Sequence, residues 1–279
     1  MKEINQMSVL DIVIVGFEGP QDFRIVSSAI LLLLFLMTLA GNSLIMVIIS
    51  ISHRLHSPMY FFLCHLSITD IIVPSNIVPN LLYVTLTERG TIPFSNCLAQ
   101  FFFFDSLLYV DHYITRQLIN CWLVAFTLAL LVVCHMLTFQ FCGSNIINHL
   151  FCDLHPFLKL SCSDTFVVDI EVLVTGILVI VLACVLIVVT YIWIFHSILG
   201  NSTTTGRQKA ISTCSSHLTV VCTYYATLVT NYMMPLTGRT TNLAKYISLL
   251  YTVITPLMNP IIYTLRNKEI KSALNSYIH

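Results

Sequence analysis

The chain has 279 residues, of which 57% are hydrophobic and only 9% are charged. Soluble domains carry about 25% charged residues, so this composition indicates an integral membrane protein and excludes an ordinary soluble domain. The formal net charge is +0 at pH 7, which gives no electrostatic basis for a nucleic-acid partner.

The N-terminal segment is polar and of mixed charge, and the first apolar run begins only near Ser27. A cleaved signal peptide would place its apolar core earlier, behind a basic start, so we expect this run to be a retained helix. A helix crosses about 30 Å of hydrocarbon with about 20 residues, and backbone groups in lipid must be bonded internally. Six runs meet this requirement, at residues 27–51, 59–82, 118–141, 167–199, 210–234 and 243–265.

A seventh, weaker run lies at residues 93–110 and is interrupted by Asp105. As a helix it would rise only about 27 Å, which is marginal for a crossing. We expect it to cross as a short third span, because all the cysteines of the polar loops then fall outside, where disulfides persist. The predicted fold is an all-α integral membrane bundle of seven transmembrane helices with a shortened third helix. It forms a single domain, 1–279, with the N-terminus outside and the C-terminus cytoplasmic.

Two spans carry polar or helix-breaking residues with a physical meaning. Asp70 lies halfway through the second run, where an ionisable group is costly and usually faces a polar interior. A protonated carboxyl bonded to a neighbouring helix is the alternative. In the last run, Pro260 frees a backbone carbonyl and bends the helix, and we expect Asn259 to satisfy part of what is lost.

The loop cysteines favour disulfides over a metal site. Three of them recur every ten residues, without the tight Cys-x-x-Cys or His-x-x-x-His spacing of metal ligands. Two disulfides among Cys97, Cys142, Cys152 and Cys162 fit better, and the residues alone leave all three pairings open. We expect the other six cysteines, in apolar spans, to be free thiols.

Five blocks stand in order along the chain. They are Gly41-Asn42, LHSPMYFFLCHLSITD at 55–70, FCGSNIINHLFCDLHPFLKLSCSDT at 141–165, RQKAISTCSSHLTVV at 207–221 and PLMNPIIYTLRNKEIK at 256–271. Together they resemble the olfactory (odorant) receptors, a family of rhodopsin-like G-protein-coupled receptors. The resemblance extends over the whole chain. It also implies a short surface helix at about 266–276, for which a solvated tail is the alternative.

The resemblance implies roles for particular residues. It implies disulfides Cys97–Cys152 and Cys142–Cys162, and a polar network of Asn42, Asp70 and Asn259 with sodium as its candidate ion. It places the ligand pocket in the outer half of the bundle, between the third, fifth and sixth spans. The candidate pocket residues are Tyr225, Val229 and Tyr232 on the sixth span and Thr175, Val179 and Leu182 on the fifth. For each of the six, ordinary helix packing is the alternative.

One family block is absent. The run Met-Ala-Tyr-Asp-Arg-Tyr-Val-Ala-Ile-Cys, expected at the inner end of the third helix, is missing, and about twenty residues, close to one helix length, are gone. Asp111-His112-Tyr113 resembles its central triad only superficially and contains no Arg. In similar receptors that Arg meets the G protein, so its loss bears directly on coupling.

The resemblance implies an odorant receptor of the plasma membrane that binds small volatile ligands and signals through a Gs-type G protein to cyclic AMP. The alternative is a truncated, non-signalling family member retained in the cell. A transporter or channel would show internal repeats or several intramembrane charges, and an enzyme would show a nucleophile–base set or metal ligands. The sequence shows neither pattern, and we expect no cofactor.

Overall fold

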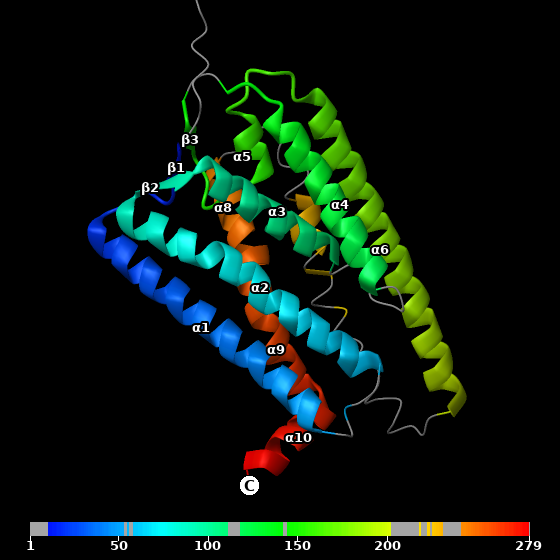
Figure 1. The fold of residues 1–279 in the computed structure, drawn as a ribbon. Helices are drawn as coiled ribbons and strands as arrows, with labels where there is room; N and C mark the ends of the chain where they lie inside the picture. The colour runs from blue at the N-terminus through cyan, green and yellow to red at the C-terminus, as the bar shows by residue number, and fades with distance from the viewer. Residues whose placement is uncertain are drawn as a thin grey trace, which may run out of the picture.

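The structure is a computed structural model that describes residues 11–52, 55, 58–110, 118–141, 144–201, 218, 222–223, 225–230 and 241–278. Its helices run in one general direction and form a bundle, with a small sheet at one end and the C-terminus at the other (Figure 1). Three helices, Gln21–Ile51, Phe166–Val189 and Asn242–Thr264, are long and apolar enough to cross a membrane, counting only the described residues. The predicted all-α membrane bundle is therefore confirmed.

The helices of the bundle follow the apolar runs of the sequence. They are α1 (Gln21–Ile51), α2 (Pro58–Thr87), α3 (Phe94–Val110), α4 (Leu118–Leu137), α6 (Phe166–Asn201) and the continuous series α8 (Thr241–Leu249), η2 (Leu250–Ile254) and α9 (Thr255–Arg266). Two shorter helices are α5 (Leu154–Leu158) and α10 (Lys268–Ile278). Residues 225–230 are helical and belong to the sixth predicted run, most of which lies outside the described residues.

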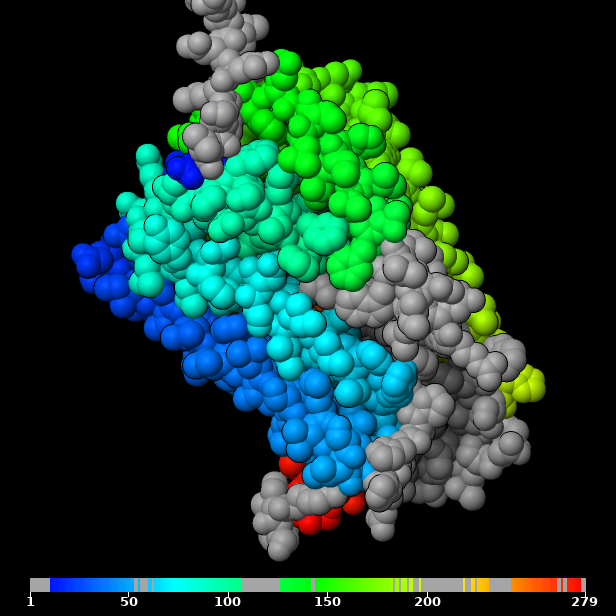
Figure 2. Space-filling model, viewed as in Figure 1, coloured from blue at the N-terminus to red at the C-terminus, as the bar shows by residue number. Residues whose placement is uncertain are grey.

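The third helix is the shortest of the candidate crossings. α3 has 17 residues, against 31 in α1 and 30 in α2, so it rises only about 26 Å. It packs against α4 and, less extensively, against α2, while α1 packs along α2 and α6 lies against α4 (Figure 1). Figure 2 shows α1 and α2, in blue and cyan, as one continuous face with β2 and α3 over its upper end. Seven crossings remain a prediction.

A three-stranded sheet, which the sequence did not predict, closes one end of the bundle. Strand β1 (Asp11–Val15) lies between β2 (Arg89–Pro93), to which it is antiparallel, and β3 (Ile146–Ile147), to which it is parallel. Ile12 and Ile14 alternate toward the core and are fully buried. The sheet therefore ties the N-terminal segment to the α2–α3 connection and to the loop between α4 and α6.

The opposite end of the bundle is organised around Asn267. Its side-chain oxygen accepts a hydrogen bond from the Tyr60 hydroxyl at 3.3 Å and another from the backbone N–H of Ile270 at 3.2 Å. The second bond caps the first turn of α10. Ile270 is buried against α1 and α2 residues while Lys271 is exposed, so α10 is amphipathic and turns away from α9.

Candidate functional site

Of the three residues predicted to form a polar network, two are bonded to each other and the third is bonded to the backbone of α9; all three are buried. Asn259 on α9 donates from Nδ2 to Oδ2 of Asp70 on α2 at 2.7 Å. Asn42 on α1 donates to the backbone oxygen of Pro256 on α9 at 3.1 Å, and to that of Thr38 in its own helix at 3.0 Å. α9 is thus bonded to both α1 and α2, and no direct bond joins Asn42 to the other two side chains.

The bond from Asn42 corrects one detail of the sequence interpretation. Pro260 has no backbone N–H, so the carbonyl four residues earlier, that of Pro256, loses its helical partner. We expected Asn259 to compensate for this loss, but its amide is directed at Asp70, and Asn42 reaches across from α1 instead. A Cβ on Gly41 would lie 3.0 Å from both Cβ and Cγ of Pro260, so the glycine permits this close approach of α1.

Two amide oxygens of the network have no hydrogen-bond partner. They are Oδ1 of Asn42 and Oδ1 of Asn259, and both are buried. An unpaired buried acceptor is unfavourable unless water or an ion satisfies it. Together with the carboxylate of Asp70 they supply the uncharged and charged oxygen ligands that hard cations prefer. These three side chains therefore carry the types of oxygen ligand that a small hard cation takes.

The start of α3 is fixed to the loop between α4 and α6 by a disulfide and by hydrogen bonds. Cys97 and Cys152 are disulfide-bonded, with their Cα atoms 5.4 Å apart. Gln100 and Asn76 each donate to the other's backbone oxygen at 2.9 Å, and Gln100 Oε1 accepts from Cys152 N–H at 3.1 Å. α2, α3 and the outer loop thus form one unit at this end.

A second disulfide involves the same loop. Cys162 is disulfide-bonded, and its predicted partner, Cys142, lies outside the described residues. Phe141 and Ser161 form an antiparallel bridge, and Cys162 N–H donates to the backbone oxygen of Gln140 at 2.9 Å. The two chain segments that would carry this disulfide are therefore adjacent.

Lys245 and His149 hold the sheet end of the bundle against α8. The ammonium of Lys245, almost fully buried, donates to the backbone oxygens of Val15 at 3.1 Å and Gly16 at 2.7 Å. His149 Nε2 lies 3.2 Å from Ser248 Oγ and 3.9 Å from Asp153 Oδ2. Burial lowers the pKa of His149, and Lys245 lowers it further, against the opposing effect of Asp153. The sequence alone predicts neither of these contacts.

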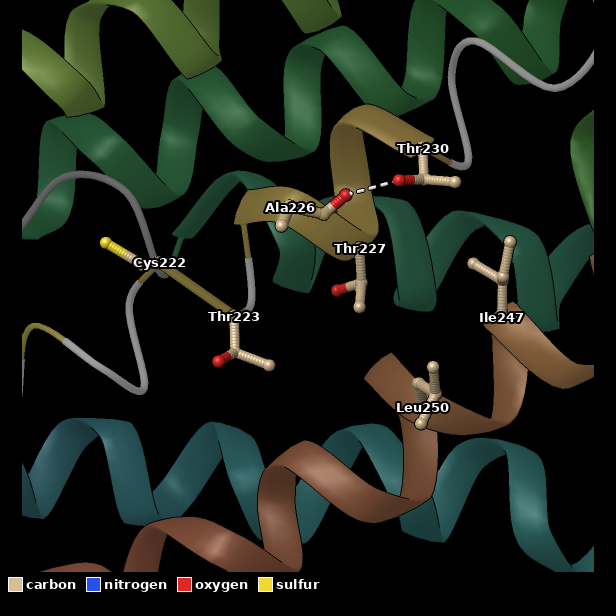
Figure 3. Close-up of a pocket in the computed structure, with 7 residues that line it drawn as sticks. All are labelled: Cys222, Thr223, Ala226, Thr227, Thr230, Ile247 and Leu250. Carbon is tan, nitrogen blue, oxygen red and sulfur yellow. Dashed lines mark hydrogen bonds between the residues drawn. The ribbon is translucent and has the colours of Figure 1, made fainter.

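A cavity of about 420 Å³ lies between the sixth-span helix and α8–η2. Figure 3 shows Thr227 from one side and Ile247 and Leu250 from the other pointing toward the space between them. Its described lining residues are Cys222, Thr223, Ala226, Thr227, Thr230, Ile247 and Leu250, none of which is charged. The hydroxyl of Thr230 donates to the backbone oxygen of Ala226 at 2.7 Å. The lining is mostly apolar with a few hydroxyl groups.

None of the predicted pocket residues that the structure describes lines this cavity. Tyr225 and Val229 lie in the same helical segment between the lining positions, and Tyr232 lies outside the described residues. Thr175, Val179 and Leu182 lie on α6, where the hydroxyl of Thr175 donates to the backbone oxygen of Glu171 at 2.6 Å. All six remain predictions. The residues that do line the cavity carry no sequence signal, because apolar side chains and threonines are ordinary in a membrane helix.

Comparison with known proteins shows that nearly the whole chain is similar in sequence to one family. A family model described as "Olfactory receptor" matches residues 31–117 and 108–279. The chain is 36% identical to olfactory receptor 10A3 of Homo sapiens over 301 residues, covering 98% of this chain and 96% of the relative. Olfactory receptor 1468 of Rattus norvegicus and olfactory receptor 5P76 of Mus musculus are similar at the same identity and coverage.

These comparisons also bear on the shortened third helix. The match to olfactory receptor 1S2 of Homo sapiens extends over 306 residues, whereas this chain has only 279, so the chain must be gapped in the alignment. The two family-model matches meet and overlap at residues 108–117, directly at the end of α3. The break between the two matches thus falls where the sequence predicts the missing block.

Proposed function

Because the chain belongs to the olfactory receptor family, we propose that it is an odorant receptor that binds small volatile ligands and signals through a Gs-type G protein to cyclic AMP. The observation that carries this proposal is the extent of the similarity, 98% of this chain and 96% of the relative 10A3. Members of this family are receptors and not enzymes. The partners in this proposal are a small ligand and a G protein.

The helices α8, η2 and α9 support the part of this function that requires a conformational change. α9 carries two interruptions of regular helix, the π-helical turn η2 before it and Pro260 within it. Such features act as hinges because they break the regular backbone ladder. The bonds from α9 to Asn42 and Asp70 give the hinge one defined arrangement, and a ligand that binds another arrangement better shifts the equilibrium toward it.

The polar network is proposed to hold a sodium ion. Asp70 would supply the negative charge, and the unpaired amide oxygens of Asn42 and Asn259 would supply neutral oxygen ligands. An ion held there would stabilise the arrangement in which α1, α2 and α9 are bonded together.

Ligand binding is proposed for the outer half of the bundle, around the sixth span. Tyr225, Val229 and Tyr232 would contact the ligand from one helix, and Thr175, Val179 and Leu182 from α6. A tyrosine combines an apolar ring with a polar tip, which suits small ligands that carry one hydrogen-bonding group. The Cys142–Cys162 disulfide belongs to the same proposal, since it would stabilise the loop above these residues.

The proposed location is the plasma membrane, with the N-terminus outside and the C-terminus cytoplasmic. The sheet supports this orientation because it places residues 11–15, the α2–α3 connection and the loop after α4 at one end, while α10 lies at the other (Figure 1). The disulfide at the sheet end agrees with an extracellular environment.

One observation favours a second candidate, a non-signalling family member retained in the cell. α3 has only 17 residues and the chain lacks the inner block with its Asp-Arg-Tyr triad. A third helix of this length reaches the inner surface poorly, and the residue that meets the G protein in similar receptors is missing.

A cell assay tests the proposal against this alternative. The chain carries an N-terminal tag, surface tag is labelled on intact cells, and cyclic AMP is measured against an odorant panel. We expect surface labelling and a ligand-dependent rise in cyclic AMP that is absent in cells without the receptor. Retention inside the cell, or surface display with no response while a full-length relative responds, would reject signalling and favour the alternative.

A further inference from the structure

His149 lies where the loop between α4 and α6 meets α8, at the sheet end of the bundle. It is only 2% exposed, and its ring packs edge-on against that of Phe151, with the ring centroids 5.0 Å apart. Its Nε2 lies 3.2 Å from Oγ of Ser248 on α8. Because this hydrogen bond joins the loop to a helix, a change in the protonation of His149 acts on a contact between two elements.

The hydrogen bonds around Ser248 indicate that His149 is neutral in this arrangement. The Tyr251 hydroxyl donates to Oγ of Ser248 at 3.5 Å, so this oxygen already accepts one hydrogen bond. Ser248 is fully buried, and its own hydroxyl hydrogen therefore needs an acceptor. Nε2 of His149 can accept it only while that nitrogen carries no proton. Protonation of Nε2 turns the acceptor into a donor and removes the partner of the Ser248 hydrogen.

The charges that act on His149 lie on opposite sides of this contact. Asp153 belongs to the same loop, and its Oδ2 lies 3.9 Å from Nε2 of His149. Lys245 belongs to α8 and opposes a positive charge on His149, whereas Asp153 favours one. Glu18 offsets part of the charge of Lys245. A protonated ring is thus attracted to its own loop and repelled by the helix to which the neutral ring is bonded.

Two further ionisable groups act through Asp153. Asp105 is buried on α3, and its charge and that of Asp153 repel each other. A positive charge on His149 offsets this repulsion, because it lies beside Asp153. His155 in α5 is also favoured in its charged form by Asp153. His155 therefore competes with His149 for the same carboxylate, and a test of His149 must control for it.

We propose that His149 is a proton-sensitive switch: its neutral ring bonds the loop to Ser248 of α8, and its charged ring leaves Ser248 and pairs with Asp153, which separates the loop from α8. A shift of roughly 1 Å brings the ring and the carboxylate to the distance of a charge-assisted hydrogen bond. In the proposed orientation this end faces the extracellular fluid, so the switch responds to extracellular acidification. The inference goes beyond the proposed function and holds whether or not the chain couples to a G protein.

Protonation and separation favour each other. Burial, and to a smaller extent Lys245, lower the pKa of His149 while it is bonded to α8. A proton therefore binds more readily once the ring has moved away from α8, and acidification shifts the equilibrium toward the separated arrangement. Tyr251, which donates to Ser248, lies in η2, so the change also reaches the π-helical turn that leads to α9.

Distances between two spin labels, measured by double electron–electron resonance in lipid nanodiscs, test the switch without a ligand or a G protein. The labels are attached at Asn148→Cys in the loop and Asn242→Cys in α8, both exposed positions, after the six cysteines of the apolar spans are replaced by Ala. Spectra are compared at about pH 7.5 and pH 5.5, on either side of the ordinary pKa of histidine. We expect a second, longer distance whose share is at least five times larger at the lower pH. Equal distance distributions at both pH values overturn the inference.

Three variants identify the group that takes up the proton. His149→Gln still offers Ser248 an acceptor but cannot be charged, and it should keep the shorter distance at both pH values. Asp153→Asn keeps an oxygen that caps α5 but loses the charge that attracts the ring, so the share of the longer distance at pH 5.5 should fall at least two-fold. His155→Gln is the matched control and should leave the change intact.

The outcomes separate the switch from other sources of pH dependence. If the longer distance still appears in His149→Gln, or is lost in His155→Gln, another group senses the proton and the inference is overturned. Melting temperature and a single peak in size-exclusion chromatography at the higher pH establish that each variant is folded. If His149→Gln does not fold, Asp153→Asn decides, since an undiminished share of the longer distance in that variant also overturns the inference.

Discussion

At the scale of single residues, the contact between α1 and α9 shows how one proline determines which residues lie opposite it. A proline inside a helix leaves a carbonyl without its backbone donor. In this chain the donor is replaced by a side chain from another helix, Asn42, and the approach needed for that bond depends on Gly41, which has no Cβ to meet Pro260. Gly41 and Asn42, which are neighbours in α1, thus both accommodate the break that Pro260 makes in the hydrogen bonding of α9.

Asn42→Ala tests this relation. The substitution leaves the carbonyl of Pro256 buried without a partner, which costs about 1–3 kcal/mol. We expect a lower melting temperature in detergent, measured by thiol-reactive dye or by loss of a monodisperse peak. Ser50→Ala is the control, because the Ser50 hydroxyl is exposed and bonds only to Met46 in its own helix. Equal melting temperatures for the two variants would contradict the assigned role of Asn42.

Asp70 gives a second prediction, on the ion. A cation that binds only the folded state stabilises it by mass action, so replacing sodium chloride with choline chloride at equal ionic strength should lower the melting temperature. Asp70→Asn removes the charge but keeps an oxygen acceptor for Asn259, and it should abolish most of this sodium effect. The same sodium dependence in the variant would show that the ion is bound elsewhere.

His149 gives a prediction on pH. Burial and Lys245 lower its pKa in the folded state, so the unfolded chain binds a proton more readily. Stability is therefore unaffected by this group above the unfolded pKa of about 6.5 and falls as pH drops below it. Asp153, whose Oδ2 lies 3.9 Å from Nε2 of His149, opposes this lowering of the pKa but does not reverse it.

The measurement is the melting temperature in detergent between about pH 7.5 and pH 5.5, across the ordinary titration range of histidine. We expect a decrease on acidification that is smaller in His149→Gln, which cannot be charged in this range. His155, whose pKa burial also lowers, accounts for part of what remains. An equal decrease in the native chain and in His149→Gln would show that His149 does not contribute.

At the scale of elements, the outer sheet depends on a bond to a helix. β3 has only two residues and β1 has five, and so small a sheet is marginal without support. Lys245 provides that support at the C-terminal end of β1, where the chain passes over α8.

Lys245→Met should release β1. Hydrogen bonds from a charged donor contribute about 1.5–3 kcal/mol each, so we expect the backbone amides of residues 11–15 to exchange with solvent at least ten-fold faster. Hydrogen exchange followed by mass spectrometry measures this directly. Lys271→Met, on the exposed face of α10, is the control and should leave exchange in β1 unchanged. Unchanged exchange in both variants would show that the sheet is held by its packing alone.

The elements also show what the sequence could and could not predict. The bundle helices were predictable because each requires a long apolar run, and the described part of α3 has 17 residues. The sheet was not, because β1 and β2 are five-residue segments far apart in the chain, and their pairing depends on how the helices bring them together. Asn42, Asp70 and Asn259 were predicted as a group, but the bond to Pro256 depends on the distance between α1 and α9, which no local pattern contains.

At the scale of the whole molecule, the features that hold the bundle together lie at its sheet end and at its centre. The sheet end has the Cys97–Cys152 disulfide and the three-stranded sheet, and the centre has the bond between Asn259 and Asp70. At the other end, residues 111–117, which follow α3, lie outside the described residues, and the sequence lacks the block with the Asp-Arg-Tyr triad. Because these parts are separated along the bundle, ligand binding and coupling should respond differently to repair of α3.

Insertion of the family's missing block, with its Asp-Arg-Tyr triad, after Val110 tests this separation. A longer third helix would span the bilayer fully and restore the inner Arg, so we expect at least a ten-fold larger ligand-dependent cyclic-AMP response at equal surface level. Ligand binding should change less than coupling, because the described cavity lining lies on the sixth span and α8–η2. The same insertion with its Arg replaced by Ala separates helix length from charge and should restore surface level but not the response. A native chain that already responds as strongly as the repaired one would show that its own inner residues suffice for coupling.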